Sequence, residues 1–64
     1  MKGQRYRHVK RGTVYEVLGL CAIQDATSDY DGEKAVLYFD ARHQHKLWCR
    51  PLKEFLDGRF ERVS

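Results

Sequence analysis

Trp48 and Arg50 have the residue types and the spacing of a binding pair. They are two positions apart in a short apolar run, so on a β-strand they lie on the same face. An indole ring stacks on a nucleobase or a partner's side chain, and a guanidinium holds phosphate or carboxylate through two hydrogen bonds. If Leu47 and Cys49 point into a core, this pair points outward. The competing interpretation is that Trp48 covers the open end of a small core, with Arg50 stacked on it.

Basic residues gather in two acid-free segments. Residues 1–11 carry five Lys or Arg side chains, and residues 41–50 carry three, whereas residues 12–40 carry six acids against one base. If the two basic segments meet in space, they form a face that attracts an anionic partner. The candidate binding residues are Arg5, Arg7, His8, Lys10, Arg11, Arg42, Lys46, Trp48 and Arg50.

Metal and cofactor chemistry have little support. His43 and His45 with Cys21 or Cys49 offer zinc-ligand types, but the cysteines stand singly in apolar runs rather than in a CxxC pair. The acidic residues of the polar segment 25–33 lack the spacing of an EF-hand. We therefore expect no metal ion and no cofactor.

Catalysis and membrane insertion also lack a sequence signal. No nucleophile lies beside an obvious base, and no glycine-rich phosphate loop is present. No apolar run approaches the ~18–20 residues that span a bilayer, and no apolar stretch follows the first lysine as in a secretory signal. The two cysteines, each within an apolar run, suit a reduced compartment. We expect a cytoplasmic, non-enzymatic protein.

The elements that must position these residues are β-strands. Runs rich in β-branched and aromatic residues, separated by polar or Gly-containing turns, predict a single all-β domain over residues 1–64. Gly19 lies inside the longest strand and predicts a bulge or bend there. Pro51 ends the fourth strand and begins one helical turn that reaches Leu56. The five predicted strands cover residues 6–10, 13–23, 35–40, 47–50 and 59–63.

This order of elements favours a small SH3-like barrel. It has five short strands, a long bent second strand, and a helical turn before the last strand. Closure into a barrel would remove the unpaired edges of so small a sheet. The residues expected to point inward are Tyr6, Val14, Val17, Leu20, Val36, Leu37, Phe39, Leu47, Leu52, Phe55, Phe60 and Val63.

Three stretches together resemble a family of short, uncharacterised bacterial and phage proteins that show a YRH…YEVLG…LWxRP…F pattern. They are Tyr6-Arg7-His8, Tyr15-Glu16-Val17-Leu18-Gly19, and Leu47-Trp48-Cys49-Arg50-Pro51-Leu52, with Phe55 after it. The chain departs from the pattern in a longer polar loop at residues 25–33, and in Cys49 where an aliphatic residue or Ala is more usual. The resemblance implies an SH3-like β domain and no known activity.

Two functions follow from the residues. The first is nucleic-acid binding, because the basic segments can contact phosphates while Trp48 and the tyrosines stack on bases. The alternative is a protein-interaction module, because SH3-like barrels bind extended peptides on aromatic surfaces. One form of this alternative is a phage-encoded protein that binds a host protein. Self-association is also open, since the basic face of one copy could meet the acidic loop of another. We expect a monomer or weak homo-oligomer that does not enter membranes.

Overall fold

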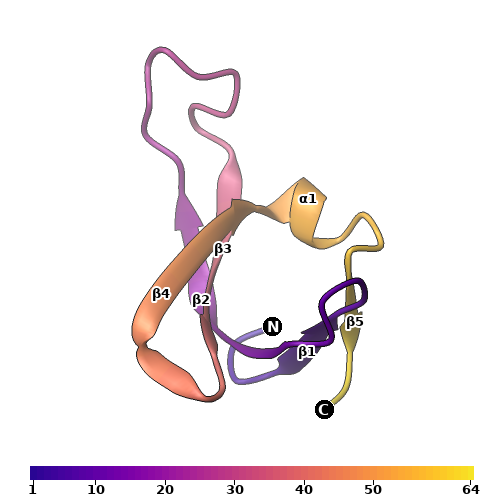
Figure 1. Cartoon of the computed structure of the whole chain (residues 1–64). Helices are drawn as coiled ribbons and strands as arrows, with labels where there is room; N and C mark the ends of the chain where they lie inside the picture. The colour runs from indigo at the N-terminus through magenta and orange to yellow at the C-terminus, as the bar shows by residue number, and fades with distance from the viewer.

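The central strands form where β-branched and aromatic residues are concentrated. The computed structural model describes residues 1–64 and contains five strands and one short helix (Figure 1). The predicted helical turn is present as α1, but Pro51 precedes its first residue instead of occupying it, and Leu56 follows its last. The elements are β1 (Arg5–His8), β2 (Val14–Ala22), β3 (Lys34–Asp40), β4 (His43–Pro51), α1 (Leu52–Phe55) and β5 (Phe60–Arg62).

All strands join one antiparallel sheet in the order β4-β3-β2-β1-β5. The register of the β2–β3 pair shifts between Val17 and Gly19, which confirms the bulge predicted at the glycine. A bulge increases local twist and bends its strand. Figure 1 shows the result, a strongly curved sheet whose edge strands β4 and β5 stand on opposite sides of the concave face. We call this concave face the inner face and the other the outer face.

The predicted β fold with five strands and one short helix is confirmed, but the sheet is not closed into the expected SH3-like barrel. β4 and β5 are the two edges, and no hydrogen-bonded ladder joins them. The chain between β4 and β5 forms α1 and the turn after it. The gap between the two edge strands is therefore bridged by side chains and not by backbone hydrogen bonds. The Arg50 guanidinium carbon from β4 lies 5.6 Å from the centre of the Phe60 ring on β5.

Aromatic rings fill the core between the inner face and α1. Phe55 of α1 stacks on Phe60 with ring centres 4.2 Å apart and meets Tyr38 and Tyr6 edge-on at 5.3 and 5.0 Å. Four members of the expected inward set are buried, and Tyr6 and Leu52 pack against them partly buried. The seven buried residues are Tyr15, Val17, Ala35, Val36, Tyr38, Phe55 and Phe60.

Several residues expected in the core lie outside it. Leu37 pairs with Cys49, and Phe39 with Leu47. Because side chains alternate along a strand, these pairs lie on the face opposite Val36 and Tyr38. Leu47 is 56% exposed as a result. Three further members of that set, Val14, Leu20 and Val63, are also not buried. Three residues outside the set are buried instead: Tyr15, Ala35 and Tyr38.

The remaining boundaries differ by a few residues. β4 begins at His43, four residues before the predicted start, because β3 and β4 are joined by a tight turn at Ala41 and Arg42. The polar segment after β2 forms the long loop expected from its composition and projects beyond the end of β2 and β3 (Figure 1). The single helix has four residues, so the structure contains no helix that could span a bilayer.

Candidate functional site

Trp48 and Arg50 share one strand face, as their spacing predicts, and it is the inner face. Trp48 is paired with buried Tyr38, and Arg50 with buried Val36, which places all four on the inner face. The pair nevertheless remains accessible because β4 is an edge strand and α1 covers only part of the inner face. The exposed fraction of Trp48 is 40%. Leu47, expected in the core, lies on the outer face with Cys49, so the condition under which Trp48 and Arg50 would point outward is not met.

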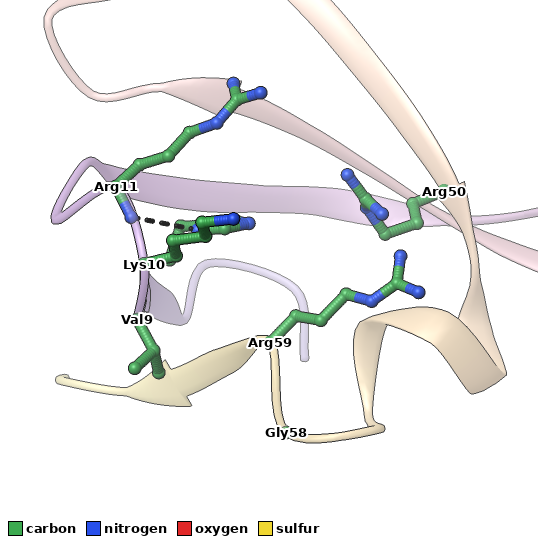
Figure 2. A pocket seen from close by; sticks show the side chains of 7 residues that line it. Val9, Lys10, Arg11, Arg50, Gly58 and Arg59 are labelled. Carbon is green, nitrogen blue, oxygen red and sulfur yellow. Dashed lines mark hydrogen bonds between the residues drawn. The ribbon is translucent and has the colours of Figure 1, made fainter.

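A basic pocket opens where Arg50 faces the two turns that flank β1 and β5. Its volume is about 780 Å³. Figure 2 shows the side chains of Lys10, Arg50 and Arg59 directed toward the pocket from different elements, with Arg11 along its rim. The residues that line this basic pocket are His8, Val9, Lys10, Arg11, Arg50, Gly58 and Arg59.

A smaller aromatic pocket of about 170 Å³ adjoins the basic pocket. The two share His8, Arg11 and Arg50, so they form one continuous depression with a cationic part and an aromatic part. Lys46 lies over the Trp48 ring at 4.7 Å from its centre and adds a further cation at the edge. The residues that line the aromatic pocket are His8, Arg11, Tyr15, Tyr38, Trp48, Arg50 and Phe60.

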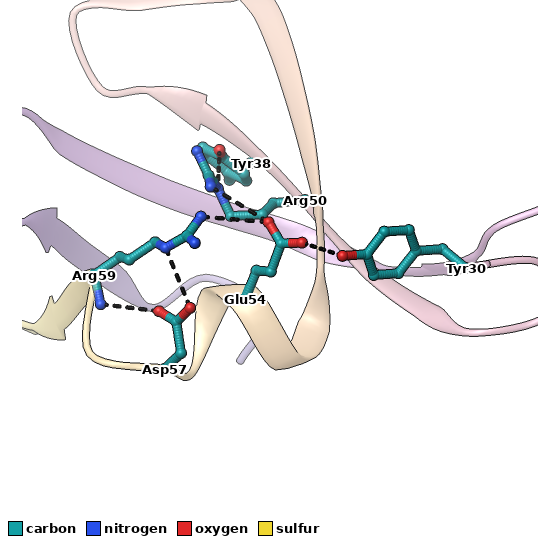
Figure 3. A network of polar contacts seen from close by, with 6 residues as sticks. All are labelled: Tyr30, Tyr38, Arg50, Glu54, Asp57 and Arg59. Atoms are coloured by element: carbon teal, nitrogen blue, oxygen red, sulfur yellow. Dashed lines mark hydrogen bonds and ion pairs between the residues drawn. The ribbon is translucent and has the colours of Figure 1, made fainter. Parts of the chain in front are cut away.

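Glu54 on α1 orients the arginines at the junction of the pockets (Figure 3). One of its carboxylate oxygens lies 3.7 Å from Arg50 and 3.3 Å from Arg59, and the other accepts a 2.6 Å hydrogen bond from the Tyr30 hydroxyl. Asp57 holds Arg59 from the other side at 3.1 Å. The guanidinium groups are therefore fixed in direction before any ligand binds.

Three titratable groups in or beside the depression have shifted pKa values, for different reasons. Partial burial and then the cations Arg11, Arg50, Arg59 and Lys10 lower the pKa of His8 below 6.5, so the imidazole is mainly neutral at pH 7. The Tyr38 hydroxyl, within 3.4 Å of Arg50 Nε, raises the pKa of that guanidinium further. The hydrogen bond to Glu54 likewise raises the pKa of Tyr30.

The structure brings part of the predicted residue set together. His8, Lys10, Arg11 and Arg50 line the basic pocket, and Trp48 lines the aromatic pocket beside it. The basic segments meet although β1 and β4 are not neighbours in the sheet, because curvature carries the β1–β2 turn toward the end of β4.

The other predicted residues lie elsewhere. Arg5 and Arg7 point to the outer face, where each pairs with one carboxylate, Glu16 and Glu61 respectively. Arg42 lines a separate pocket of about 330 Å³ at the β3–β4 turn, which touches the basic pocket only through Arg11. These three arginines are therefore not part of the depression described above.

Arg59 belongs to the site but was missed by the sequence analysis. It lies in the last fourteen residues, where acids and bases balance, so charge segregation gave no signal. Its place just after Asp57-Gly58 was the available clue. Gly58 has a φ of 105°, which an L side chain rarely adopts, and this turn directs Arg59 toward Glu54.

No group of three or more His, Cys, Asp or Glu side chains is arranged to hold a metal ion. His43 and His45 meet edge-on with ring centres 6.1 Å apart, and both cysteines are free thiols. The depression itself presents cations and aromatic rings, groups that can bind anions and flat rings.

Comparison with known proteins gives a family but no activity. The model of a family described as "Protein of unknown function (DUF1653)" matches residues 4–62, which is nearly the whole chain. No curated protein and no solved structure matches.

Proposed function

This chain belongs to DUF1653, a family of proteins of unknown function, and from that premise we propose that it binds nucleic acid at the mouth of its inner face. The observation that carries the proposal is that the half-exposed Trp48 ring shares a pocket with Arg11 and Arg50. These two cations also line the adjoining basic pocket, together with Lys10 and Arg59. Aromatic rings that stack on bases, beside cations that contact phosphates, are the two parts of a nucleic-acid surface.

The acidic loop of residues 25–33 does not stand in the way of such a ligand. None of residues 25–33 lines either pocket, and the loop that carries them projects beyond the end of the sheet (Figure 1). Asp25 and Asp31 are occupied within that loop, since Asp31 accepts a hydrogen bond from the Asp25 amide and Asp25 accepts one from Thr27. The acidic residues of this loop therefore lie away from the basic pocket and do not repel a phosphate bound there.

An amide NMR titration with a short mixed-sequence oligonucleotide tests the proposal. We expect shifts at Lys10, Arg11, Trp48, Arg50 and Arg59 that shrink as salt rises, because each phosphate contact releases counterions. A spectrum that does not change at low salt overturns the proposal. Shifts confined to the outer-face strand positions would place binding elsewhere and overturn it too.

One observation favours a second candidate, a protein partner on the outer face. Leu47 is 56% exposed beside the incompletely buried Leu37, Phe39 and exposed Cys49, and the register puts all four on that face. Apolar surface of this kind often marks a protein contact. Affinity capture from a nuclease-treated lysate, with Leu47→Asp as the control, tests it. A specific partner retained only by the unchanged chain supports it, and identical eluates contradict it.

A further inference from the structure

The basic pocket and the aromatic pocket together fit one end of a single strand better than they fit the middle of one. We infer that, as a nucleic-acid-binding protein of the kind proposed above, this chain recognises a phosphorylated end. The terminal base stacks on Trp48 and the terminal phosphate monoester enters the basic pocket. The inference rests on the proposed function and adds to it the class of ligand.

Charge is the first argument. Four cations line the basic pocket, Lys10, Arg11, Arg50 and Arg59, and two carboxylates contact them, Glu54 and Asp57. The excess is two positive charges. A phosphodiester within a strand carries one negative charge, whereas a phosphomonoester carries between about 1.5 and 2 at pH 7 because its second pKa is about 6. The monoester therefore matches the excess of the pocket more closely.

Free donors are the second argument. Arg50 and Arg59 are aimed by Glu54, while neither Lys10 nor Arg11 forms an ion pair with any carboxylate. The pocket thus combines two oriented guanidinium groups with two cations whose donors are unoccupied. A monoester has three oxygens able to accept from such donors, one more than the two unesterified oxygens of a diester.

The closure of the pocket is the third argument. Trp48 does not line the basic pocket, whose lining includes Val9 and Gly58 on two turns. The Val9 amide donates a 2.9 Å hydrogen bond to the Arg59 carbonyl, which ties these turns together. A nucleic-acid strand that runs from Trp48 past Arg50 meets this hydrogen-bonded backbone. A strand that ends in the pocket therefore fits, whereas a strand that continues must turn away from it.

A duplex is a poor match for the same site. Its bases are stacked and paired inside the helix, so a base reaches Trp48 only after it leaves the stack. The unpaired end of a single strand presents its base without that cost. The expected ligand is therefore a single strand with a phosphate at the 5′ or the 3′ end.

Trp48 provides the readout because it is the only tryptophan in the chain. Its fluorescence is titrated with one pentanucleotide in three forms, 5′-phosphorylated, 3′-phosphorylated and unphosphorylated, and with a blunt duplex of the same sequence. We expect quenching by the single strands, with one phosphorylated form bound about tenfold more tightly than the unphosphorylated form. The phosphorylated form that binds more tightly identifies whether the protein recognises the 5′ or the 3′ end.

Arg11→Gln and Arg5→Gln are the matched pair of variants. Both remove one arginine charge, but Arg11 lines the basic pocket and Arg5 lies on the outer face. We expect Arg11→Gln to reduce the preference for the phosphorylated end to less than about threefold, and Arg5→Gln to retain it.

The outcomes separate this inference from the proposed function. Equal affinity for phosphorylated and unphosphorylated strands, with clear quenching by all, overturns the inference and leaves nucleic-acid binding in place. No response to any oligonucleotide overturns both. Tighter binding of the duplex than of every single strand overturns the inference, as does equal loss of the end preference in both variants.

Discussion

Arg7 and His8 are consecutive residues of β1, yet they lie on faces with opposite electrostatic character. On the outer face, Arg7 is paired with Glu61 and Arg5 with Glu16, so each positive charge has one carboxylate. On the inner face, His8 borders a pocket where cations outnumber the carboxylates. Exposed ion pairs of the outer kind contribute about 0–1 kcal/mol each to stability. The same residue types thus serve mainly the fold on one face and are left available to a ligand on the other.

The largest effect is expected from the core that shapes the inner face. Phe55→Ala removes the ring that packs on Phe60, Tyr38 and Tyr6, and truncation of a buried Phe costs about 3–5 kcal/mol. A domain of this length has roughly 3–10 kcal/mol of stability, so we expect extensive unfolding near 37 °C. Thermal denaturation followed by circular dichroism measures it. A melting temperature within a few degrees of the unchanged protein would contradict this packing.

Trp48 and Leu47 are neighbours on opposite faces and provide the next test. Trp48→Ala should weaken oligonucleotide binding by about 1–3 kcal/mol, the usual contribution of a stacked base. Leu47→Ala should leave affinity unchanged, because Leu47 lies on the outer face. Fluorescence anisotropy of a labelled single strand measures both. Equal losses in the two variants would remove the distinction between the faces.

Neutralising one carboxylate on each face provides a third test, with a smaller expected change in affinity and of opposite sign to that of Trp48→Ala. Glu54→Gln removes a negative charge from beside Arg50 and Arg59, whereas Glu61→Gln removes one from beside Arg7. We expect affinity for an oligonucleotide to rise two- to threefold in Glu54→Gln, since a charge about 8 Å away in water contributes about 0.5 kcal/mol. Glu61→Gln should have no effect. The same anisotropy assay applies, and a loss of affinity in Glu54→Gln would mean that orientation of the arginines outweighs charge.

The smallest expected effect is the titration of His8. Its pKa is below 6.5 in the free protein because of partial burial and the surrounding cations. Since the folded pKa is lowered, the stability that neutral His8 contributes is present above pH 6.5 and is lost as pH falls through the folded pKa. A bound anion favours the imidazolium, so oligonucleotide should raise the His8 pKa. NMR titration of the imidazole with and without ligand measures this, and an unchanged pKa would place the anion away from His8.

The sequence predicts the strands better than their faces. Alternation and turn residues locate β2, β3 and the bulge near Gly19, because these features depend on neighbours in sequence. The faces of β4 depend on which partner it takes and in which register. Leu47 and Trp48 are both apolar, so composition alone does not decide which of them points inward. The register of Tyr38 with Trp48 decides it, and that is a long-range property.

The candidate site likewise has residues that the local sequence predicts and residues that only the three-dimensional structure brings in. Trp48, Arg50 and the basic β1–β2 turn are recognisable from residue type and local charge. Arg59 joins them only because α1 carries Glu54 to a point between two arginines that are nine residues apart. The open edge between β4 and β5 also depends on how far the sheet curves. No short-range sequence pattern predicts how far the sheet curves.

Pro51, the last residue of β4, has an entropic consequence for Arg50. A residue that precedes proline is sterically restricted to extended backbone conformations, in the unfolded chain as well as in the native one. Fixing one backbone residue ordinarily costs about 1–2 kcal/mol, and here part of that freedom is absent before folding begins. One hydrogen bond to Tyr38 and the contact with Glu54 then restrict the side chain itself. The guanidinium is preorganised, so a ligand that binds it meets little loss of conformational entropy on the protein's side.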